Sequence, residues 1–194
     1  MIKFFYSTFI IFIISIGSLP AQSFESGAFG APVIKYTRLA NQPALMVGGK
    51  GGWIINKRFV LGAGVYALTS DVKTPYINEQ NNQSVMFNFN YGGLEFEFLL
   101  LPQNKFNVTF DMLLAGGGLE FYAQNKNNNS TSYGSVDLLV WEPELNFEAE
   151  IYNWLHADAG ISYRIISSYK EAYSVTKNDI QGLSFLLTFK FGAY

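Results

Sequence analysis

The chain has 194 residues, which suits a single domain, and its formal net charge at pH 7 is −2. Aromatic residues make up 17% of it and charged residues only 14%, against about 25% charged residues in a typical water-soluble domain. There is no basic stripe for nucleic acid, and the lack of cysteine excludes disulfides, thiolate metal sites and cysteine nucleophiles. Much apolar surface must therefore face something other than water.

The first 21 residues predict a secretory signal peptide. Lys3 precedes an apolar run from Phe4 to Ile16, and Ala21 is a small residue at the expected cleavage site. An N-terminal anchor is the alternative, but the run is shorter than the roughly 20 residues of a spanning helix. Gly or a charge interrupts every later apolar stretch. We therefore expect export with loss of residues 1–21, and a mature domain, residues 22–194, that enters a membrane only as strands.

Period-two alternation predicts eight strands in the mature domain, because successive side chains of a strand point to opposite faces. The predicted strands are Gly27–Thr37, Ala44–Ile55, Phe59–Thr69, Val85–Leu101, Phe106–Ala123, Val136–Ile151, Leu155–Ile166 and Gly182–Ala193. Tight turns lie on one side of this meander, at Asn56–Arg58, Pro102–Lys105 and Tyr152–Trp154. The other side has Leu39–Pro43 and three longer loops, Asp71–Ser84, Gln124–Ser135 and Ser167–Gln181. Outer-membrane barrels have this arrangement, with short turns in the periplasm and longer loops outside.

The alternation leaves open which face of the strands meets the core. In Val136–Ile151, glutamates at every second position alternate with large apolar residues. A soluble barrel would turn the glutamates to water, whereas a membrane barrel would hold them in its lumen. The predicted strands of 11 to 18 residues exceed the five or six of soluble sheets, so their length favours the membrane.

Two strands change the phase of their apolar residues midway. In Val85–Leu101 the switch falls at Gly92-Gly93, and in Phe106–Ala123 it falls at Gly116–Gly118. Glycines at a change of phase are typical of β-bulges, which bend a sheet and help it to close. We therefore predict bulges at these two places.

The chain resembles the small eight-stranded outer-membrane barrels of the OmpX and OmpA type, and in particular such barrels of the Bacteroidota. The resemblance rests on the leader ending Ser18–Gln22 and on the closing segment Gly182–Gly192, which is similar to the terminal-strand signal of outer-membrane proteins. It implies an all-β fold, an eight-stranded antiparallel up-and-down transmembrane β-barrel in the outer membrane. It also implies contact with outer-membrane lipid and with the barrel-assembly machinery during biogenesis. A monomer without cofactor, metal or nucleic acid is expected, with a structural or surface-interaction role and no enzyme activity.

Charged residues on the polar faces predict an ion-pair network that fills the lumen. Its acidic members are Glu95, Glu97, Asp111, Glu120, Glu142, Glu144, Glu148 and Glu150. Its basic members are Lys50, His156, Arg164 and Lys190, with Lys35 as a further candidate. A turn centred on Asn153 would place Glu142 opposite Arg164 and Glu150 opposite His156. A proton or cation path is the alternative, but so narrow a barrel is normally filled by its own side chains.

His156 is the only histidine, and Asp158 and Ser162 follow it on the same strand face. This set raises the alternative of an outer-membrane lipid hydrolase, although Ser162 lies about 20 Å along the strand from His156. A divalent metal site of His and Glu is another alternative. A structural pairing of His156 with Glu150 is the preferred interpretation.

The long loops are polar and rich in asparagine, which predicts solvated segments that can carry surface recognition. The candidate contact residues are Tyr76, Ile77, Tyr133, Tyr169 and Tyr173. One further alternative is a soluble, secreted barrel that binds a small apolar ligand. It would place Trp141, Phe185 and Phe189 in an internal cavity and the glutamates in water.

Overall fold

The computed structural model describes residues 26–78, 83–102, 105–124 and 130–193. Its strands are β1 (Ser26–Leu39), β2 (Gln42–Ile55), β3 (Phe59–Leu68), β4 (Val72–Asn78), β5 (Gln83–Pro102), β6 (Phe106–Gln124), β7 (Ser130–Tyr152), β8 (Leu155–Ser167) and β9 (Gly182–Ala193), and its short helix is α2 (Lys177–Ile180). The predicted leader, residues 1–21, lies outside these ranges. Within them, no helix is long and apolar enough to span a membrane.

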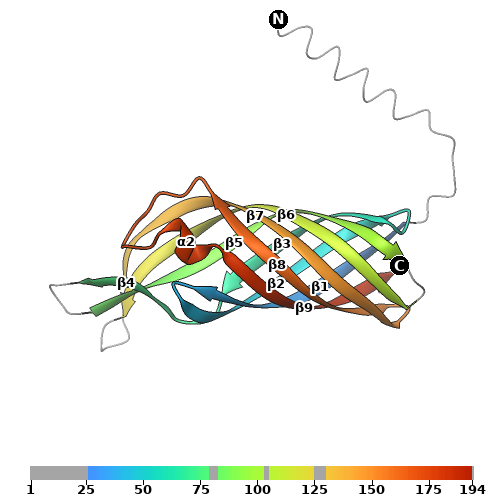
Figure 1. Ribbon diagram of the computed structural model, residues 1–194, viewed down its shortest axis with the longest axis horizontal. Coiled ribbons are helices and arrows are strands. Elements are labelled where there is room, and N and C mark those ends of the chain that lie inside the picture. The colour runs from blue at the N-terminus through green and yellow to red at the C-terminus, as the bar shows by residue number, and fades with distance from the viewer. Residues whose placement is uncertain (1–25, 79–82, 103–104, 125–129, 194) are drawn as a thin grey trace, which may run out of the picture.

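Eight of the nine strands close into an antiparallel ring (Figure 1). The order around the ring is β1, β2, β3, β5, β6, β7, β8 and β9, and β9 pairs with β1. The ring closes between β3 and β5, where Phe59 lies opposite Phe98 and Ala67 opposite Asn90. Closure gives each ring strand a hydrogen-bonding neighbour on both sides, so that the backbone N–H and C=O groups have partners without an open sheet edge. The predicted eight-stranded up-and-down barrel is confirmed.

Two of the predicted loops contain regular structure. The connection Asp71–Ser84 holds β4, which pairs with β5 outside the ring. The connection Ser167–Gln181 holds α2, whose capping box joins Thr176 and Asp179. As plain loops these predictions are wrong, because one turn of helix and a short edge strand are too brief to produce a hydrophobic period.

Tight hairpins join the first three strands. Ala40 and Asn41 have φ of 46° and 61°, and Asn56 and Lys57 have φ of 52° and 53°. Two successive residues in the left-handed region define a type I′ turn, whose twist matches that of the flanking strands. Figure 1 shows β4 and α2 at one end of the barrel, which we call the loop end, and the C-terminus at the other, which we call the turn end.

Along β9 and the turn-end part of the longer strands, the outer face of the barrel is apolar and the inner face is polar. On β9, Phe185 and Phe189 are 56% and 44% exposed outside, whereas Ser184 and Lys190 are buried inside. Trp141 on β7 is likewise 51% exposed. The soluble barrel with these aromatic residues in a cavity is therefore contradicted, since they form an outer belt that excludes water only when lipid surrounds it.

Toward the loop end, strands β5, β6 and β7 reverse this arrangement. On β5, Phe89 and Glu95 both point inward and are buried, although one is aromatic and the other charged. On the outer face of the same strand, exposed Asn90 gives way to Leu94, which is 58% exposed. Inner and outer chemistry therefore exchange between Asn90 and Leu94, while the strand itself continues.

The predicted bulges at the glycines are wrong. Pairing of β3 with β5 runs without a break through Gly92 and Gly93, and pairing of β6 with β7 runs without a break through Gly116–Gly118. The apolar residues changed phase in the sequence because the apolar face moves from outside to inside the barrel at this level. The register shift in β5 lies elsewhere, between Leu99 and Leu101.

Two apolar layers enclose the charged part of the lumen. The larger layer fills the loop end and includes Met46, Val85, Phe87, Phe89, Leu119, Phe121, Ile166, Val175 and Ile180. The smaller layer lies at the turn end and comprises Phe29, Ala31, Ile54 and Val60. Between them, the barrel has a polar section with its own internal bonding.

Exposed aromatic residues gather at the turn end. Trp53, Phe106 and Trp154 are 51%, 53% and 56% exposed. The Trp154 ring stacks on Tyr152 at 5.7 Å and on Phe191 at 6.2 Å between centroids. Such rings suit the boundary between hydrocarbon and water, where one face is apolar and the edge is wet.

Candidate functional site: a charged lumen under an apolar cap

Lys190 is the cation nearest the turn end of the polar section. Its Nζ lies 2.7 Å from Glu97 Oε1, 2.7 Å from Glu148 Oε2 and 3.1 Å from Asp158 Oδ2. The Lys190 side chain is fully buried, so water hardly screens these pairs. Because the three carboxylates come from β5, β7 and β8, one ammonium group on β9 joins four strands across the barrel.

Lys50 forms a second centre further along the lumen. Its Nζ lies 2.7 Å from Asp111 Oδ2, 2.8 Å from Glu95 Oε1 and 3.5 Å from Glu144 Oε1. The Asn146 amide nitrogen donates to both Asp111 and Glu144, at 3.1 and 2.8 Å. This amide supplies a neutral donor where carboxylates from β6 and β7 come together.

Lys35, the further candidate of the sequence analysis, forms the third centre. Its Nζ lies 3.1 Å from Glu142 Oε1 and 3.6 Å above the centre of the Tyr66 ring, which adds a cation–π contact. Glu142 also accepts hydrogen bonds from the Tyr91 hydroxyl at 2.7 Å and from the Ser162 hydroxyl at 2.5 Å. The glutamate is thus held by one cation and two neutral donors.

Buried carboxylates outnumber buried cations in the described part of the lumen. The carboxylates are Glu95, Glu97, Asp111, Glu142, Glu144, Glu148 and Asp158, and the cations are Lys35, Lys50, Arg164 and Lys190. The three lysines are therefore shared among carboxylates from several strands. Such sharing couples the strands, and loss of one cation would leave more than one buried charge without its partner.

Arg164 takes a different role from the predicted one. The register places Trp141 opposite Ile165 and Glu144 opposite Ser162, so Glu142 lies across from Arg164 as expected. The guanidinium nevertheless turns to the loop end, where Nε donates to the Ile180 carbonyl at 2.8 Å.

The other guanidinium nitrogens of Arg164 reach Thr37 Oγ1 at 3.3 Å and Met46 Sδ at 3.5 Å. Its carbon lies 5.2 Å from the centre of the Phe89 ring. Among the described residues, no carboxylate lies within ion-pair distance of Arg164. This side chain ties the segment between β8 and β9 to the barrel wall, because the planar fork can serve several acceptors at once.

That segment forms a cap over the loop end. Val175 and Ile180 are fully buried in the larger apolar layer. The Ala40 amide donates to the Asp179 carbonyl at 2.7 Å, and the Ile166 amide donates to Gln181 Oε1 at 3.1 Å. The cap is therefore joined by packing and by hydrogen bonds to the barrel beneath it.

Three of the predicted loop tyrosines take part in this cap. Tyr173 packs on Phe121 at 4.7 Å between ring centroids, and its hydroxyl donates to the Tyr133 carbonyl at 2.7 Å. The Tyr169 hydroxyl donates to the Val175 carbonyl at 3.1 Å, and burial raises the pKa of Tyr169 above its ordinary value. Tyr133, Tyr169 and Tyr173 are half-buried, so much of their surface serves the cap itself.

Tyr76 and Ile77 lie on β4. Tyr76 is 39% exposed and meets Tyr173 edge to face at 5.8 Å. Of the candidate contact residues with a described side chain, Tyr76 is the most accessible. Contact of these residues with a partner stays a prediction. The asparagine-rich stretches 79–82 and 125–129 lie outside the described residues.

One predicted lumen carboxylate lies elsewhere. Glu120 on β6 is exposed on the outer face, so its assignment to the lumen is wrong. The physical reason is the exchange of faces, since Leu119 and Phe121 point inward at that level. Glu150 keeps the inward phase of β7 and lies opposite His156 in the register, as predicted, and it is half-buried near the turn end.

The residues of the hydrolase alternative are not assembled as a catalytic set. His156 Nδ1 lies 3.1 Å from Glu148 Oε1, whereas the Ser162 hydroxyl donates to Glu142. Both side chains are buried inside the barrel, where lipid has no access. No group of three or more His, Asp or Glu suited to a metal ion occurs among the described residues.

The sequence did not predict several members of the lumen network, namely Tyr66, Tyr91, Asn146 and, as an ion-pair partner, Asp158. Asp158 shares the phase of His156 and Arg164, so strict use of the period would have included it. The tyrosines point inward as part of the apolar layer at the loop end, so the polar faces of the strands gave no signal for them.

The fold is that of the small outer-membrane β-barrels. The β-barrel domain of Pseudomonas aeruginosa OprF has a TM-score of 0.57 and 10% identity, over 88% of this chain and 99% of that one. Ail of Yersinia pestis, solved with the heparin analogue sucrose octasulfate, has a TM-score of 0.50 and 11% identity, over 88% and 99%. Neisserial surface protein A has a TM-score of 0.50 and 7% identity, over 88% and 97%.

No family model matches the chain, and no curated protein matches it in sequence. These comparisons define the architecture at the level of the fold. The particular relationship to Bacteroidota barrels stays a prediction.

Proposed function

We propose that the protein is an outer-membrane barrel that presents an interaction surface outside the cell and conducts nothing through its lumen. One observation carries the proposal. Strands β5, β6 and β7 exchange their inner and outer chemistry along their length, so that the turn-end half of the barrel suits lipid outside and the loop-end half suits water outside. A protein built this way stands partly in the bilayer and partly above it.

The turn-end half of the barrel supports placement in a membrane. Apolar side chains cover its outer face, and aromatic rings gather where the belt ends near the turn end. The closing segment Gly182–Gly192 lies on β9, which completes the ring against β1. Export through a leader and insertion by the assembly machinery belong to this proposal, as does the orientation with short turns in the periplasm.

The filled lumen supports a structural role for the ion pairs. The side chains of Lys50, Arg164 and Lys190 lie across the lumen and are at most 5% exposed. Apolar layers lie on both sides of this section. Ions that entered would have to displace packed side chains and break buried ion pairs, which is costly.

The loop-end half of the barrel supports a role in surface interaction. Its outer face carries exposed polar residues such as Asn88, Asn90, Glu120 and Asp137, while its interior has an apolar core. Strands β4 to β7 pair with one another at the loop end and carry this surface. A rigid support under an exposed polar surface is the usual basis of recognition.

Two measurements test the proposal. Purified protein in a planar lipid bilayer should give no conductance steps. Cells that produce the wild type should adhere to immobilised proteins or polysaccharides, and replacement of the exposed residues Lys73, Tyr76 and Glu120 by serine should reduce that adhesion. Matched cells producing a variant with serine at the turn-end residues Lys57 and Arg58 serve as the control. Regular conductance steps, or adhesion that both variants keep equally, would contradict the proposal.

A further inference from the structure

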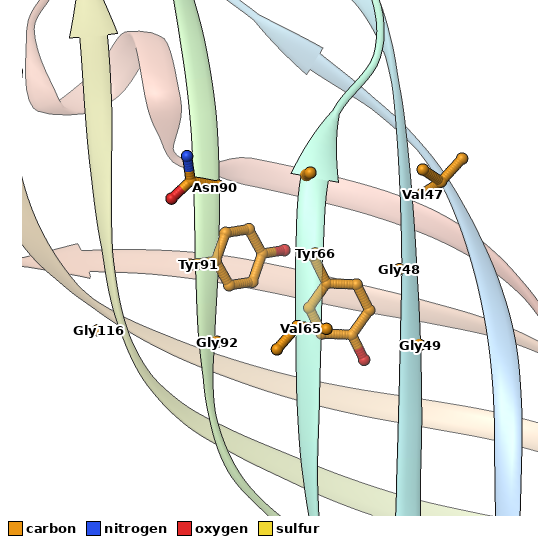
Figure 2. A pocket seen from close by; sticks show the side chains of 10 residues that line it. Val47, Gly48, Gly49, Val65, Tyr66, Asn90, Tyr91, Gly92 and Gly116 are labelled. Carbon is orange, nitrogen blue, oxygen red and sulfur yellow. The ribbon is translucent and has the colours of Figure 1, made fainter.

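The outer wall carries an apolar hollow of about 500 Å³ at the level where the two faces exchange. It crosses β2, β3, β5 and β6, and one row of paired residues forms its floor (Figure 2). That row is Gly49, Val65, Gly92 and Gly116. Val47, Ala67 and Asn90 form the next row toward the loop end.

Glycines on the inner side of this wall have a clear steric reason. A Cβ on Gly48 would lie 2.4 Å from the Tyr66 ring, and one on Gly117 would lie 2.5 Å from Tyr91 Cβ. Figure 2 shows both tyrosine rings at this level. Glycine lets these rings lie against the wall beside Lys35, whose ammonium group packs on Tyr66.

Two glycines on the outer side have no such reason. A Cβ on Gly116 would meet nothing within 4 Å, and one on Gly49 would meet only the Ala31 carbonyl, at an ordinary 3.5 Å. Glycine weakens a strand and leaves apolar surface uncovered. At these positions it keeps the hollow open rather than relieving a clash.

The surroundings of the hollow indicate its occupant. Below it the outer wall continues as the apolar belt, with Leu61 and Leu94 43% and 58% exposed, so the hollow opens into the surface that faces hydrocarbon. At its upper end Asn90 supplies an amide where the outer face becomes polar. The floor spans about 14 Å across four strands, at roughly 4.8 Å per strand spacing.

We propose that this hollow binds one hydrocarbon chain of an outer-membrane lipid, with the polar linkage of that lipid at the Asn90 amide. The inference rests on the proposed placement of the barrel in the membrane. Its volume falls in the range of about 300–1,000 Å³ of small-molecule sites. The lipid chain replaces the side chains that the outer glycines lack, which restores contacts along the wall.

The test counts lipids bound to the folded barrel. Wild type is refolded into dimyristoylphosphatidylcholine vesicles, extracted in mild detergent and examined by native mass spectrometry. Gly116→Leu and Gly49→Leu fill the hollow from two different strands. Gly30→Leu is the matched control, because Gly30 is exposed on β1, a Cβ there meets nothing within 4 Å, and it lies outside the hollow. Folding of each variant is checked by heat-modifiable gel mobility.

Wild type and Gly30→Leu should keep one lipid per barrel, and Gly116→Leu and Gly49→Leu should lose it. A folded wild type without lipid, or equal retention by all four proteins, overturns the inference and leaves the proposed function standing. A dimer that the two hollow-filling variants abolish also overturns it, in favour of a second copy on this surface. Failure of the wild type to fold in vesicles would instead contradict the membrane placement itself.

Discussion

Single cations hold together residues from distant strands in the lumen. Lys190 joins β9 to carboxylates of β5, β7 and β8, and Lys50 joins β2 to β5, β6 and β7. A buried charge pair adds little stability over an apolar replacement, but removal of one partner leaves the other charge buried alone. Loss of either lysine should therefore destabilise the barrel mainly because buried carboxylates would remain without a cation.

Lys190→Met should lower the free energy of unfolding by about 3–5 kcal/mol, the range for breaking a buried ion pair. Three carboxylates then lose a shared cation, while methionine preserves most of the side-chain volume. Lys73→Met is the control, since Lys73 is exposed on β4 and a surface change of this kind stays within about 0.5 kcal/mol. Denaturant unfolding in detergent micelles measures both, and equal midpoints for the two variants would refute the assignment.

Arg164→Ala should lower the melting temperature because it removes a contact between the cap and the barrel wall. The variant loses the hydrogen bond to the Ile180 carbonyl, and hydrogen bonds of charged groups contribute about 1.5–3 kcal/mol. Heat-modifiable mobility gives the melting temperature, and protease cleavage within residues 168–174 reports the cap. Arg164→Lys should not restore either property, because lysine lacks the planar fork. Full rescue by lysine would show that charge alone suffices.

At the scale of elements, strand positions could be predicted from the sequence far better than strand faces. The period located all eight ring strands, and the turn centred on Asn153 gave the register of β7 with β8. The apolar residues of β5 and β6 were assigned to one face throughout, which required a bulge at each glycine run. In a membrane barrel the outer face of a strand is apolar, whereas in a soluble barrel the inner face is apolar. Alternation alone therefore cannot show at which residue a strand passes from the first arrangement to the second.

The cap could not be predicted from the sequence for a different reason. α2 has four residues and β4 has seven, so neither carries a period long enough to recognise. The cap depends on contacts between segments far apart in the sequence, such as Arg164 with Ile180 and Tyr173 with Tyr133. Glu120 was misplaced because the outer face of β6 is polar at the loop end and apolar in the lipid belt.

The cap should loosen at alkaline pH. A raised folded-state pKa of Tyr169 means that the folded protein favours the neutral hydroxyl, so this contribution to stability is present below the ordinary tyrosine pKa of about 10 and is lost above it. Protease cleavage of residues 168–174 should therefore increase as the pH rises beyond that value. In Tyr169→Phe, cleavage should be faster at neutral pH and should change less with pH. Identical pH profiles for the two proteins would exclude this role.

On the scale of the whole molecule, the barrel combines two kinds of protein in one set of strands. The turn-end half has charges inside and apolar side chains outside, and the loop-end half has an apolar core and polar residues outside. The glycine-rich level between them fits both the internal tyrosines and the external hollow. The placement of the barrel in the membrane therefore depends on where along β5, β6 and β7 the outer face changes from lipid to water.

A single-cysteine scan along the outer face of β6 tests that point most directly, and the chain contains no native cysteine. With the barrel in a lipid bilayer, a membrane-impermeant maleimide should label Glu120→Cys and fail to label Phe110→Cys and Leu114→Cys. The buried neighbour Leu119→Cys should also stay unlabelled until the protein is unfolded. Equal labelling of Phe110→Cys and Glu120→Cys in the folded barrel would contradict the exchange of faces and the membrane placement that rests on it.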